Sequence, residues 1–375
     1  MSTTHLLKEE PEKDLAYGLK LISKSEYRSE LRKHLPEECF KVDTKHCLFY
    51  FACMFLYLAG MFSIIKLDFL PLKFLMSSVM GITLTSLTFF LHDLFHGSIV
   101  KSKKIQYLLG FSIGMFNLFP ALFWKRVHNY HHARTGNTDD PDRSYILSEA
   151  PKNSVEKFAY KTRMTAEAFH PLISILTMAT GFFLYFGNNL IGVLFPKSSF
   201  TTEKSKKVQF LFKNVEKPII FFELASITLF QYLLFLFIAK GSITNYIFIS
   251  LIPVAIAHCI AMAYIHTNHF LSPLTGVMDD PLINSLSLKN PLFVDKIFSN
   301  FSHHTEHHLF PEMSSRYYPM VRKLLFDLFP ERFKIMPMNQ AIKLLLKTPR
   351  IYNDFTHLIT EDKSKIIKCP VLVKS

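Results

Sequence analysis

The sequence predicts an all-α polytopic membrane protein, because apolar residues are abundant and gather in long stretches that carry almost no charge. Of the 375 residues, 49% are hydrophobic, and 38 are Phe. This composition is typical of a chain that lies largely in lipid. A helix crosses a bilayer with about 20 apolar residues, and four stretches approach that length: residues 47–65, 72–91, 219–238 and 243–265.

The four expected spans form two helical hairpins, which together predict a four-helix transmembrane stem. Asp68 and Pro71 break the chain between the first two spans, and the short link 239–242 joins the last two. Lys73 and Glu223 are charged residues inside these stretches, and each lies near the start of its span.

Two further apolar stretches, residues 107–123 and 171–195, are interrupted by Gly or Pro. Basic residues accumulate on the cytoplasmic side of membrane proteins. With the N-terminus inside, a full crossing by residues 107–123 would carry Lys125 and Arg126 outside. The second stretch is followed by lysines that we also expect inside: Lys197, Lys204, Lys206, Lys207, Lys213 and Lys217. We therefore expect both stretches to be interfacial or re-entrant.

The start of the chain is polar and lacks the basic region and apolar core of a signal peptide. We expect a cytoplasmic N-terminal arm over residues 1–46, with an amphipathic helix around residues 17–35. A membrane-embedded domain follows over residues 47–345, and a C-terminal tail over residues 346–375. The polar part from about His266 onward has no spanning stretch and is expected to form a helical cytoplasmic cap.

The net charge of +13 is typical of a surface that faces anionic lipid. The basic residues lie between apolar spans rather than along one face, so we expect no nucleic-acid partner. The five Cys residues form no CxxC pair, and the sequence therefore indicates no disulfide framework.

Of the 17 histidines, 11 fall into four short clusters, at residues 92–96, 128–132, 266–269 and 303–308. Helical residues three and four positions apart lie on one face, so each cluster is expected to point at one ion. Neutral imidazole is a good ligand for iron, zinc or copper. Eight to ten convergent histidines exceed the capacity of one ion, which predicts a dinuclear metal site. The predicted pairs and triads are His92 with His96, His128 with His131 and His132, and His304 with His307 and His308.

All four clusters are expected on the cytoplasmic side of the membrane, at one depth. The first follows the second span, the third follows the fourth span, and the other two lie in segments assigned to the cytoplasm. His258, midway along a span, is expected to be a buried, hydrogen-bonded side chain. Metal-bound His usually donates its other N–H to a carboxylate or carbonyl. The candidates for that role are Asp93, Asp139, Asp140, Asp142 and Glu306, with helix capping or simple solvation as the alternative.

The clusters resemble the motifs of the membrane fatty acid desaturase family, whose members carry one HxxxH or HxxxxH box and two HxxHH-type boxes. Here the boxes are HDLFH at residues 92–96, HNYHH at 128–132 and HTEHH at 304–308. Gly97-Ser98 after the first box and Leu309-Phe310-Pro311 after the last also match the family. The resemblance covers about residues 50–345 of the chain.

The resemblance implies a mushroom-shaped fold, with four spanning helices as the stem and a cytoplasmic cap that holds two iron ions. It implies an enzyme that uses O₂ and two electrons to remove hydrogen from two neighbouring carbons of an acyl chain, which leaves a double bond. A further ligand often follows the last span in this family. His269 fits that place best and His266 less well, while His303 is expected not to bind metal. The implied ligands are His92, His96, His128, His131, His132, His269, His304, His307 and His308.

The sequence contains no HPGG haem-binding motif, so no fused cytochrome b5 domain is expected. The resemblance then implies a separate electron donor, a ferredoxin or cytochrome b5, and a membrane lipid or acyl thioester as substrate. His304 stands where front-end desaturases often have Gln, which disfavours that subgroup. Trp124, just before the second box, is expected to anchor at the membrane interface rather than line a substrate tunnel. The oligomeric state is left open.

Three other functions are compatible with part of the sequence. A histidine-box hydroxylase or ketolase acting on alkyl or carotenoid substrates is the nearest, because Asp140-Pro141-Asp142 also occurs in ketolase-like sequences. The insert of about 134 residues between His132 and His266 disfavours it. A metalloprotease would use three ligands and leave the other clusters without a role. A metal transporter would carry its ligands near the bilayer midplane, where we expect only Glu223 and His258.

Overall fold

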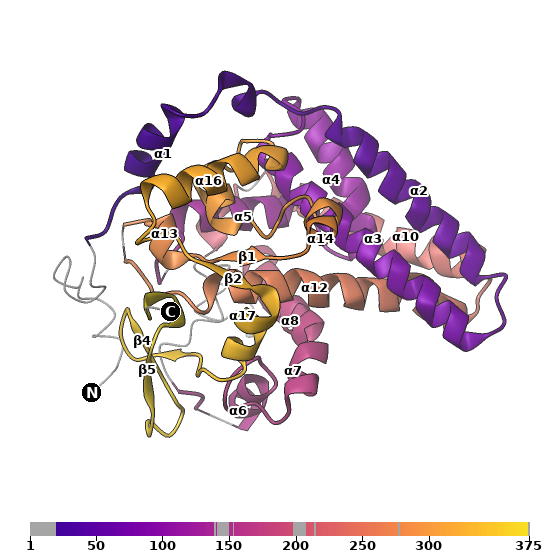
Figure 1. The fold of residues 1–375 in the computed structure, drawn as a ribbon. Coiled ribbons are helices and arrows are strands. Elements are labelled where there is room, and N and C mark those ends of the chain that lie inside the picture. The colour runs from indigo at the N-terminus through magenta and orange to yellow at the C-terminus, as the bar shows by residue number, and fades with distance from the viewer. Residues whose placement is uncertain are drawn as a thin grey trace.

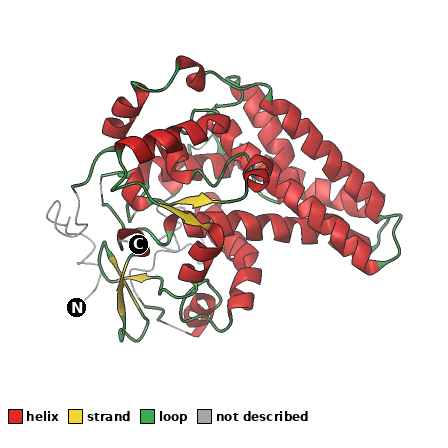
Figure 2. Cartoon of the chain, viewed as in Figure 1, coloured by secondary structure: helices red, strands yellow, loops and turns green. Residues whose placement is uncertain are grey.

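The computed structural model describes residues 20–138, 140, 150–152, 154–197, 208–213, 215–276 and 278–373. Within these residues the chain is mostly helical, with a few short strands (Figure 2). Long helices extend together to one side, and short helices, strands and loops form a broader body on the other (Figure 1). This arrangement agrees with the predicted stem and cap.

The stem contains the four expected spans. They are α2 (His46–Ile64), α3 (Leu70–His96), α10 (Lys217–Leu233) with its π-helical continuation Leu234–Ile238, and the helix formed by α11 (Ile243–Tyr246), a π-helical turn (Ile247–Leu251) and α12 (Ile252–His269). Among the described residues, these four helices are long and apolar enough to cross a membrane unbroken. The second and fourth run further than predicted, so the histidines that were expected just beyond them lie on their last turns.

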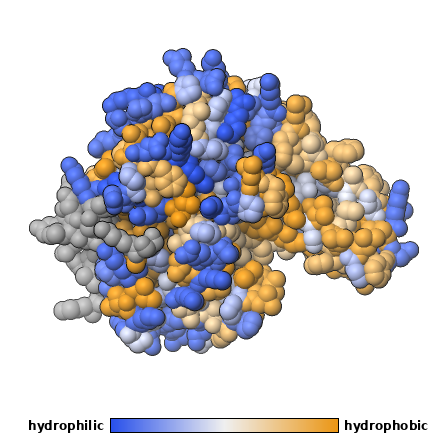
Figure 3. All heavy atoms as spheres, in the orientation of Figure 1, coloured by the Kyte–Doolittle hydropathy of each residue, from blue (hydrophilic) through white to orange (hydrophobic). Residues whose placement is uncertain are grey.

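Apolar side chains on the outside of the stem face the surroundings rather than the protein. Phe51, Phe55, Phe74 and Phe237 each leave more than half of their surface exposed. Figure 3 shows hydrophobic residues gathered over the stem and hydrophilic ones over the broader body. Exposed apolar surface on this scale is unfavourable in water and stabilising in lipid.

Polar side chains inside the stem find partners on neighbouring helices. The Lys73 ammonium donates to Asn245 Oδ1 at 2.7 Å, and the Ser77 hydroxyl donates to the carbonyl of Phe248 at 2.5 Å. Since lipid offers no hydrogen bonds, such internal pairing is what makes these residues tolerable in a span.

The first ambiguous stretch forms two helices, α4 (Lys103–Asn117) and α5 (Ala121–Arg134), which bend by 103° at their junction. Leu118 takes a left-handed conformation (φ 62°) at this elbow, and Pro120 precedes α5. Both oxygens of Glu223 on α10 accept the N–H of Leu122, at 3.1 and 3.3 Å. A buried carboxylate thus caps the start of α5, which stabilises the positive end of that helix.

The second ambiguous stretch forms α7 (Pro171–Leu176) and α8 (Met178–Leu194). With 17 residues, α8 falls just short of the helices that are long enough to span. Cys259 on α12 donates to the carbonyl of Ile175 at 3.6 Å, so this pair of helices lies against the fourth span.

The cap contains more than the expected helices. Its helices are α1 (Lys24–Arg32), α6 (Ser154–Lys161), α13 (Pro281–Asn284), α14 (Leu292–Ile297), α15 (His304–Leu309), α16 (Tyr318–Leu328) and α17 (Met338–Leu345). Strand β1 (Ser287–Lys289) pairs in parallel with β2 (Ile335–Pro337), in the register Ser287 to Ile335. The strands β3 (Ile351–Tyr352), β4 (His357–Ile359) and β5 (Ile366–Lys368) form an antiparallel sheet. The expected helical cap thus also carries short strands, which are too short to give a periodic signal in the sequence.

The amphipathic helix expected at residues 17–35 is shorter in the structure, since α1 begins at Lys24 and ends at Arg32. Residues 17–19 lie outside the described part of the chain. Tyr27 and Leu31 are fully buried and pack in one cluster with Phe310 and Leu325. Helix α1 therefore packs against the cap, next to the last histidine box.

The tight contact between α3 and α12 gives a stability prediction. A Cβ atom on Gly81 would lie 2.7 Å from Ile256 Cβ and 3.1 Å from the Pro253 carbonyl oxygen. Gly81→Val should therefore push these helices apart and destabilise the protein by about 1–3 kcal/mol, as overpacking does. Thermal unfolding in detergent measures the change.

Gly187→Ala on α8 is the matched control, because a Cβ there meets nothing within 4 Å. Its melting temperature should stay level or rise slightly, since alanine favours the helix. Equal melting temperatures for Gly81→Val and wild type would show that α3 and α12 do not touch at Gly81.

Candidate metal centre

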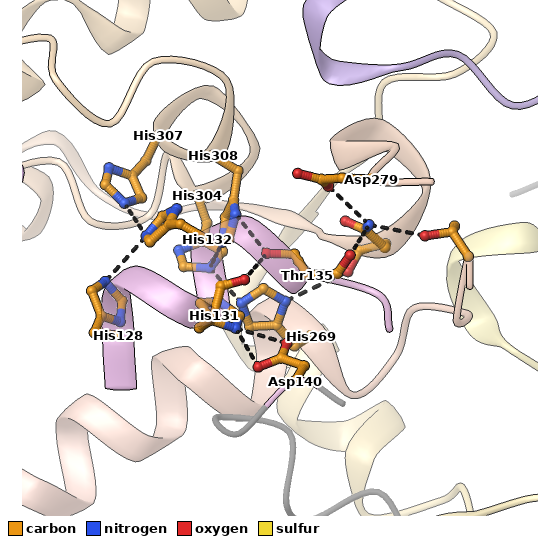
Figure 4. A network of polar contacts seen from close by, with 12 residues as sticks. His128, His131, His132, Thr135, Asp140, His269, Asp279, His304, His307 and His308 are labelled. Carbon is orange, nitrogen blue, oxygen red and sulfur yellow. Dashed lines mark hydrogen bonds and ion pairs between the residues drawn. The ribbon is translucent and has the colours of Figure 1, made fainter. Parts of the chain in front are cut away.

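The histidine boxes come from four helices that end at the same place. His92 and His96 lie on the last turns of α3, and His269 on the last turn of α12. The second box lies on α5 and the third on α15. Figure 4 shows histidine side chains from α5, α12 and α15 turned toward one another. Two of the histidine-bearing helices, α3 and α12, thus belong to the stem, whereas α5 follows the bend after α4 and α15 lies in the cap.

The nine predicted ligands form two groups. The donor atoms within each group all lie within 4.8 Å of one another, which is close enough for one metal ion to reach them all. Every member except His96, which is intermediate, is buried. The first group is His92, His96, His128, His132 and His307, and the second is His131, His269, His304 and His308.

The expectation that each box points at one ion is wrong for the second and third boxes. His131 joins the second group, while its neighbours His128 and His132 join the first; His307 likewise separates from His304 and His308. The reason lies in helix geometry: consecutive residues point about 100° apart. Adjacent His131 and His132 therefore flank the helix face and reach different ions, so that one box serves both groups.

Hydrogen bonds on the outer side orient several of these rings. His92 Nδ1 lies 3.0 Å from Asp93 Oδ1, and His131 Nδ1 lies 2.9 and 2.8 Å from the two oxygens of Asp140. The carboxylate accepts a hydrogen bond from the Nδ1–H group. The lone pair of the ring is then on Nε2, which points inward. Of the predicted outer partners, Asp93 and Asp140 take this role.

Other outer partners differ from the predictions. The oxygens of Glu306 pair with Arg322 Nε at 2.5 Å and with the Ser287 hydroxyl, so this carboxylate supports the cap rather than a histidine. Asp139 and Asp142 lie outside the described residues. Sequence reasoning missed Tyr318, whose hydroxyl lies 2.8 Å from His307 Nδ1. Nothing local marks that residue, because it reaches the site from a separate helix.

The ring nitrogens that point inward lie close to one another, as the ligands of a metal ion do. His304 Nε2 lies 2.7 Å from His269 Nε2, and His132 Nε2 lies 3.1 Å from His128 Nε2. The Nε2 atoms of His92 and His96 are buried without a hydrogen-bond partner among the described residues. Buried lone pairs without donors are costly, and a metal ion in each group would satisfy them. The donor set, all imidazole, fits iron, zinc or copper.

Burial keeps the imidazoles in the form that binds metal. It lowers the pKa of His132, His307 and His308 well below the usual value of 6.5, and neighbouring imidazoles lower it further. These rings are therefore neutral near pH 7, as a metal ligand must be.

The remaining histidines near the site have other surroundings. His266 stacks on Phe270 with ring centroids 4.6 Å apart, and His303 contacts the Ser302 hydroxyl through Nδ1 at 3.1 Å; neither belongs to a donor group. His258 is buried in α12 and donates from Nε2 to the carbonyl oxygen of Asn117 at 3.1 Å. The prediction that His258 is a buried, hydrogen-bonded residue is confirmed.

A largely apolar cavity lies against both histidine groups. Histidines of the first group (His92 and His128) and of the second (His131, His269 and His304) contribute to its wall. Most of the other lining side chains are aromatic or aliphatic: Phe89, Phe119, Phe123, Trp124, Val127, Phe182, Phe186, Ala261, Met262, Ile265 and Phe301. Such a chamber suits a long hydrocarbon chain held beside the metal site.

Trp124 lies in this wall and stacks on His128, with ring centroids 4.6 Å apart and planes 8° from parallel. The prediction that it anchors at the membrane interface is wrong, because the α4–α5 elbow turns α5 inward. Phe301 of the cap also lines the cavity, with its ring centroid 5.0 Å from that of His92 and 5.5 Å from that of His304.

Comparison with known proteins agrees with the site. The family model for fatty acid desaturases matches residues 69–339, which include all three boxes, and the chain belongs to this family. It is 33% identical over 130 residues to an sn-1 acyl-lipid omega-3 desaturase (ferredoxin) of Synechocystis sp., a match that covers 34% of this chain and 35% of the relative. It is 24% identical over 324 residues to a Delta(12) fatty acid desaturase of Calendula officinalis, covering 82% and 83%. The chain thus matches about a third of the length of the cyanobacterial relative.

The Asp140 carboxylate gives a test of the outer hydrogen bonds. Asp140→Ala removes the acceptor that fixes His131, so the second group should bind its ion roughly 10- to 100-fold more weakly. Metal retention against a graded chelator measures the loss.

Asp354→Ala is the control, because Asp354 pairs with His357 at 3.1 Å on the edge of the cap, where no donor group lies. The assignment fails if both variants retain metal equally well.

The lowered pKa values of the buried imidazoles also predict a pH dependence. Below about pH 6.5 these histidines bind protons in the unfolded chain but not in the folded, metal-free chain. The free energy of unfolding therefore decreases as the pH falls. Metal-free protein should therefore melt at steadily lower temperature between about pH 7 and pH 5, whereas the metal-loaded protein should be affected less. A melting temperature of the metal-free protein that stays constant or rises on acidification would contradict the burial of neutral imidazoles.

Proposed function

We propose that this protein is an O₂-dependent fatty acyl desaturase that introduces a double bond into an acyl chain at a di-iron centre. The observation that supports this proposal most is the meeting of two imidazole groups with one apolar cavity. The ligands we propose are His92, His96, His128, His131, His132, His269, His304, His307 and His308. With O₂ and two electrons, bound iron would supply the oxidant that an unactivated C–H bond requires.

The proposed reaction consumes one O₂, two electrons and two protons for each double bond formed. Two neighbouring CH₂ groups lose one hydrogen each and become a CH=CH pair. O₂ takes up these two hydrogens, two electrons and two protons, and leaves as two molecules of water. The two electrons would come from a separate donor protein.

The residues of this chain would hold the substrate and exclude water. The acyl chain would lie in the cavity, between Trp124 on one side and Phe301 on the other, since these rings flank histidines of both groups. Aromatic walls fix a hydrocarbon without offering it a hydrogen bond. They also keep bulk water from the reacting carbons, which protects an oxidising centre from side reactions.

We also propose that the protein is embedded in a membrane with the histidine boxes on the cytoplasmic side. Residues 1–46 would form an N-terminal arm, residues 47–345 the desaturase domain and residues 346–375 a C-terminal tail. The substrate would be a membrane lipid or an acyl thioester. The donor would be a ferredoxin or cytochrome b5; the Synechocystis relative, which carries ferredoxin in its name, favours the former.

The test is the fatty-acid profile of a desaturase-deficient host that expresses the chain. Wild-type protein should produce unsaturated chains that gas chromatography with mass spectrometry detects and whose double bond it locates. His307→Ala removes a ligand of the first group and should abolish the product. His357→Ala changes a half-buried histidine at the edge of the cap and should leave the product unchanged.

Other outcomes discriminate against the proposal. Hydroxylated chains or altered carotenoids in place of new double bonds would favour a hydroxylase or ketolase of the same histidine-box type. A full product yield from His307→Ala would contradict the ligand assignment. Ferredoxin or cytochrome b5 should be co-expressed, so that a missing donor does not hide the activity.

A further inference from the structure

The segment Asn284–Ser287, which joins α13 to β1, lies directly beside the second histidine group. We call it the frame segment. It belongs to none of the histidine boxes, and its residues are almost completely buried. Its contacts lead, by one or two hydrogen bonds, to His131, His269 and His308 of the second group, and to Thr305, the neighbour of the fourth histidine, His304.

Asn284 begins the frame segment and connects two ligand-bearing helices. Its side chain is fully buried, and Nδ2 lies 3.0 Å from the carbonyl oxygen of Thr135 and 3.2 Å from both Thr275 Oγ1 and Asp279 Oδ1. Its own carbonyl oxygen lies 3.5 Å from His269 Nδ1. Asn284 thus ties the end of α5, at Thr135, to the end of α12, at His269.

Thr135 carries this connection to two more histidines. Its hydroxyl donates to the carbonyl oxygen of His131 at 2.7 Å and lies 3.3 Å from His308 Nδ1 (Figure 4). The next residue, Gly136, has φ of 83°, and a Cβ there would lie 2.6 Å from Asn284 Nδ2. Only glycine allows the chain to pass Asn284 this closely.

The fourth histidine, His304, is reached through the residue that follows it. The Thr305 hydroxyl lies 2.9 Å from the Ser285 hydroxyl, and the Thr305 N–H donates to the Ser287 hydroxyl at 3.1 Å. In addition, the N–H of Leu286 donates to the carbonyl oxygen of Asn268, which precedes His269, at 2.8 Å. The frame segment therefore fixes α15 and α12 as well as the end of α5.

The first group is held by other residues. Asp93 orients His92 from the same helix, and Tyr318 of α16 orients His307. These supports do not involve the side chain of Asn284. The side chains that contact the rings of the two groups from outside are therefore different, although α5 and α15 carry histidines of both groups.

We propose that Asn284 is a positioning residue that sets the geometry of the second histidine group, so that the affinity of the second ion can change without that of the first. This inference rests on the proposed function, because it assumes that two ions are bound. Outer-shell residues of this kind typically change metal affinity by about 10–100-fold when they are removed. Loss of the second ion should also abolish the coupling between two irons.

The experiment compares purified, iron-loaded wild-type protein with Asn284→Ala under one graded chelator challenge. Iron per chain and the electron paramagnetic resonance spectrum are recorded at each step. The variant should lose one of its two ions at roughly 10- to 100-fold lower chelator strength, and an isolated ferric signal should appear in place of the coupled pair. A purely structural role would not produce this stepwise loss.

Three further variants complete the design. Asn339→Ala, on the exposed side of α17, is the matched control and should behave as wild type. Tyr318→Phe removes an outer partner of the first group and should release the first ion more readily. Thr135→Val preserves side-chain volume, and it should release the second ion even if Asn284→Ala does not fold.

The outcomes separate this inference from the proposed function. Wild-type protein that binds fewer than two irons would overturn both. Wild-type protein with two irons, but variants at Asn284 and Thr135 that retain both ions as firmly, would overturn the inference alone. Loss of both ions together from these variants would also overturn it, because the two positions would then share one scaffold.

Discussion

The structure depends on one constraint: nine imidazoles, all buried except the half-buried His96, converge in two groups whose donor nitrogens lie within 4.8 Å of one another. Burial removes the hydration of an imidazole and disfavours its protonation. Outer partners such as Asp140 accept a hydrogen bond from one ring nitrogen and leave the other pointing inward. The inward nitrogens lie as close together as the 2.7 Å between His269 Nε2 and His304 Nε2. Two groups of imidazole nitrogens at this spacing form an arrangement that metal ions would stabilise.

The rest of the fold brings the four histidine-bearing helices, α3, α5, α12 and α15, together at this site. The spans α3 and α12 end there, and their packing at Gly81 sets how far apart they stand. The α4–α5 elbow turns the second box inward, and Glu223 caps the start of α5. The cap closes the site with α15. The same elbow and spans enclose the aromatic cavity, so that the substrate chamber and the metal site share their walls.

Much of this could be predicted from the sequence, because hydropathy and histidine spacing are local signals. The four spans and all nine members of the two donor groups were predicted. Asp93 and Asp140 were also identified, since they are close in sequence to the histidines that they contact.

The errors have a common origin in three-dimensional packing. Adjacent histidines of an HxxHH box point about 100° apart on a helix, but only the packing of neighbouring helices shows that these two directions lead to different donor groups. Trp124 was assigned to the interface because the bend before α5 leaves no mark in hydropathy. Tyr318 and Asn284 were not found, because they reach the histidines from segments that are remote in sequence. The short strands of the cap were missed because three residues give no periodic pattern.

We propose that nine histidines hold two irons, and X-ray absorption spectroscopy at the iron edge of the purified protein tests this proposal. We expect a first shell of nitrogen and oxygen ligands, with the outer-shell scattering characteristic of several imidazoles around each iron. A first shell that contains sulfur, or iron without imidazole scattering, would contradict it. So would protein that binds zinc and rejects iron.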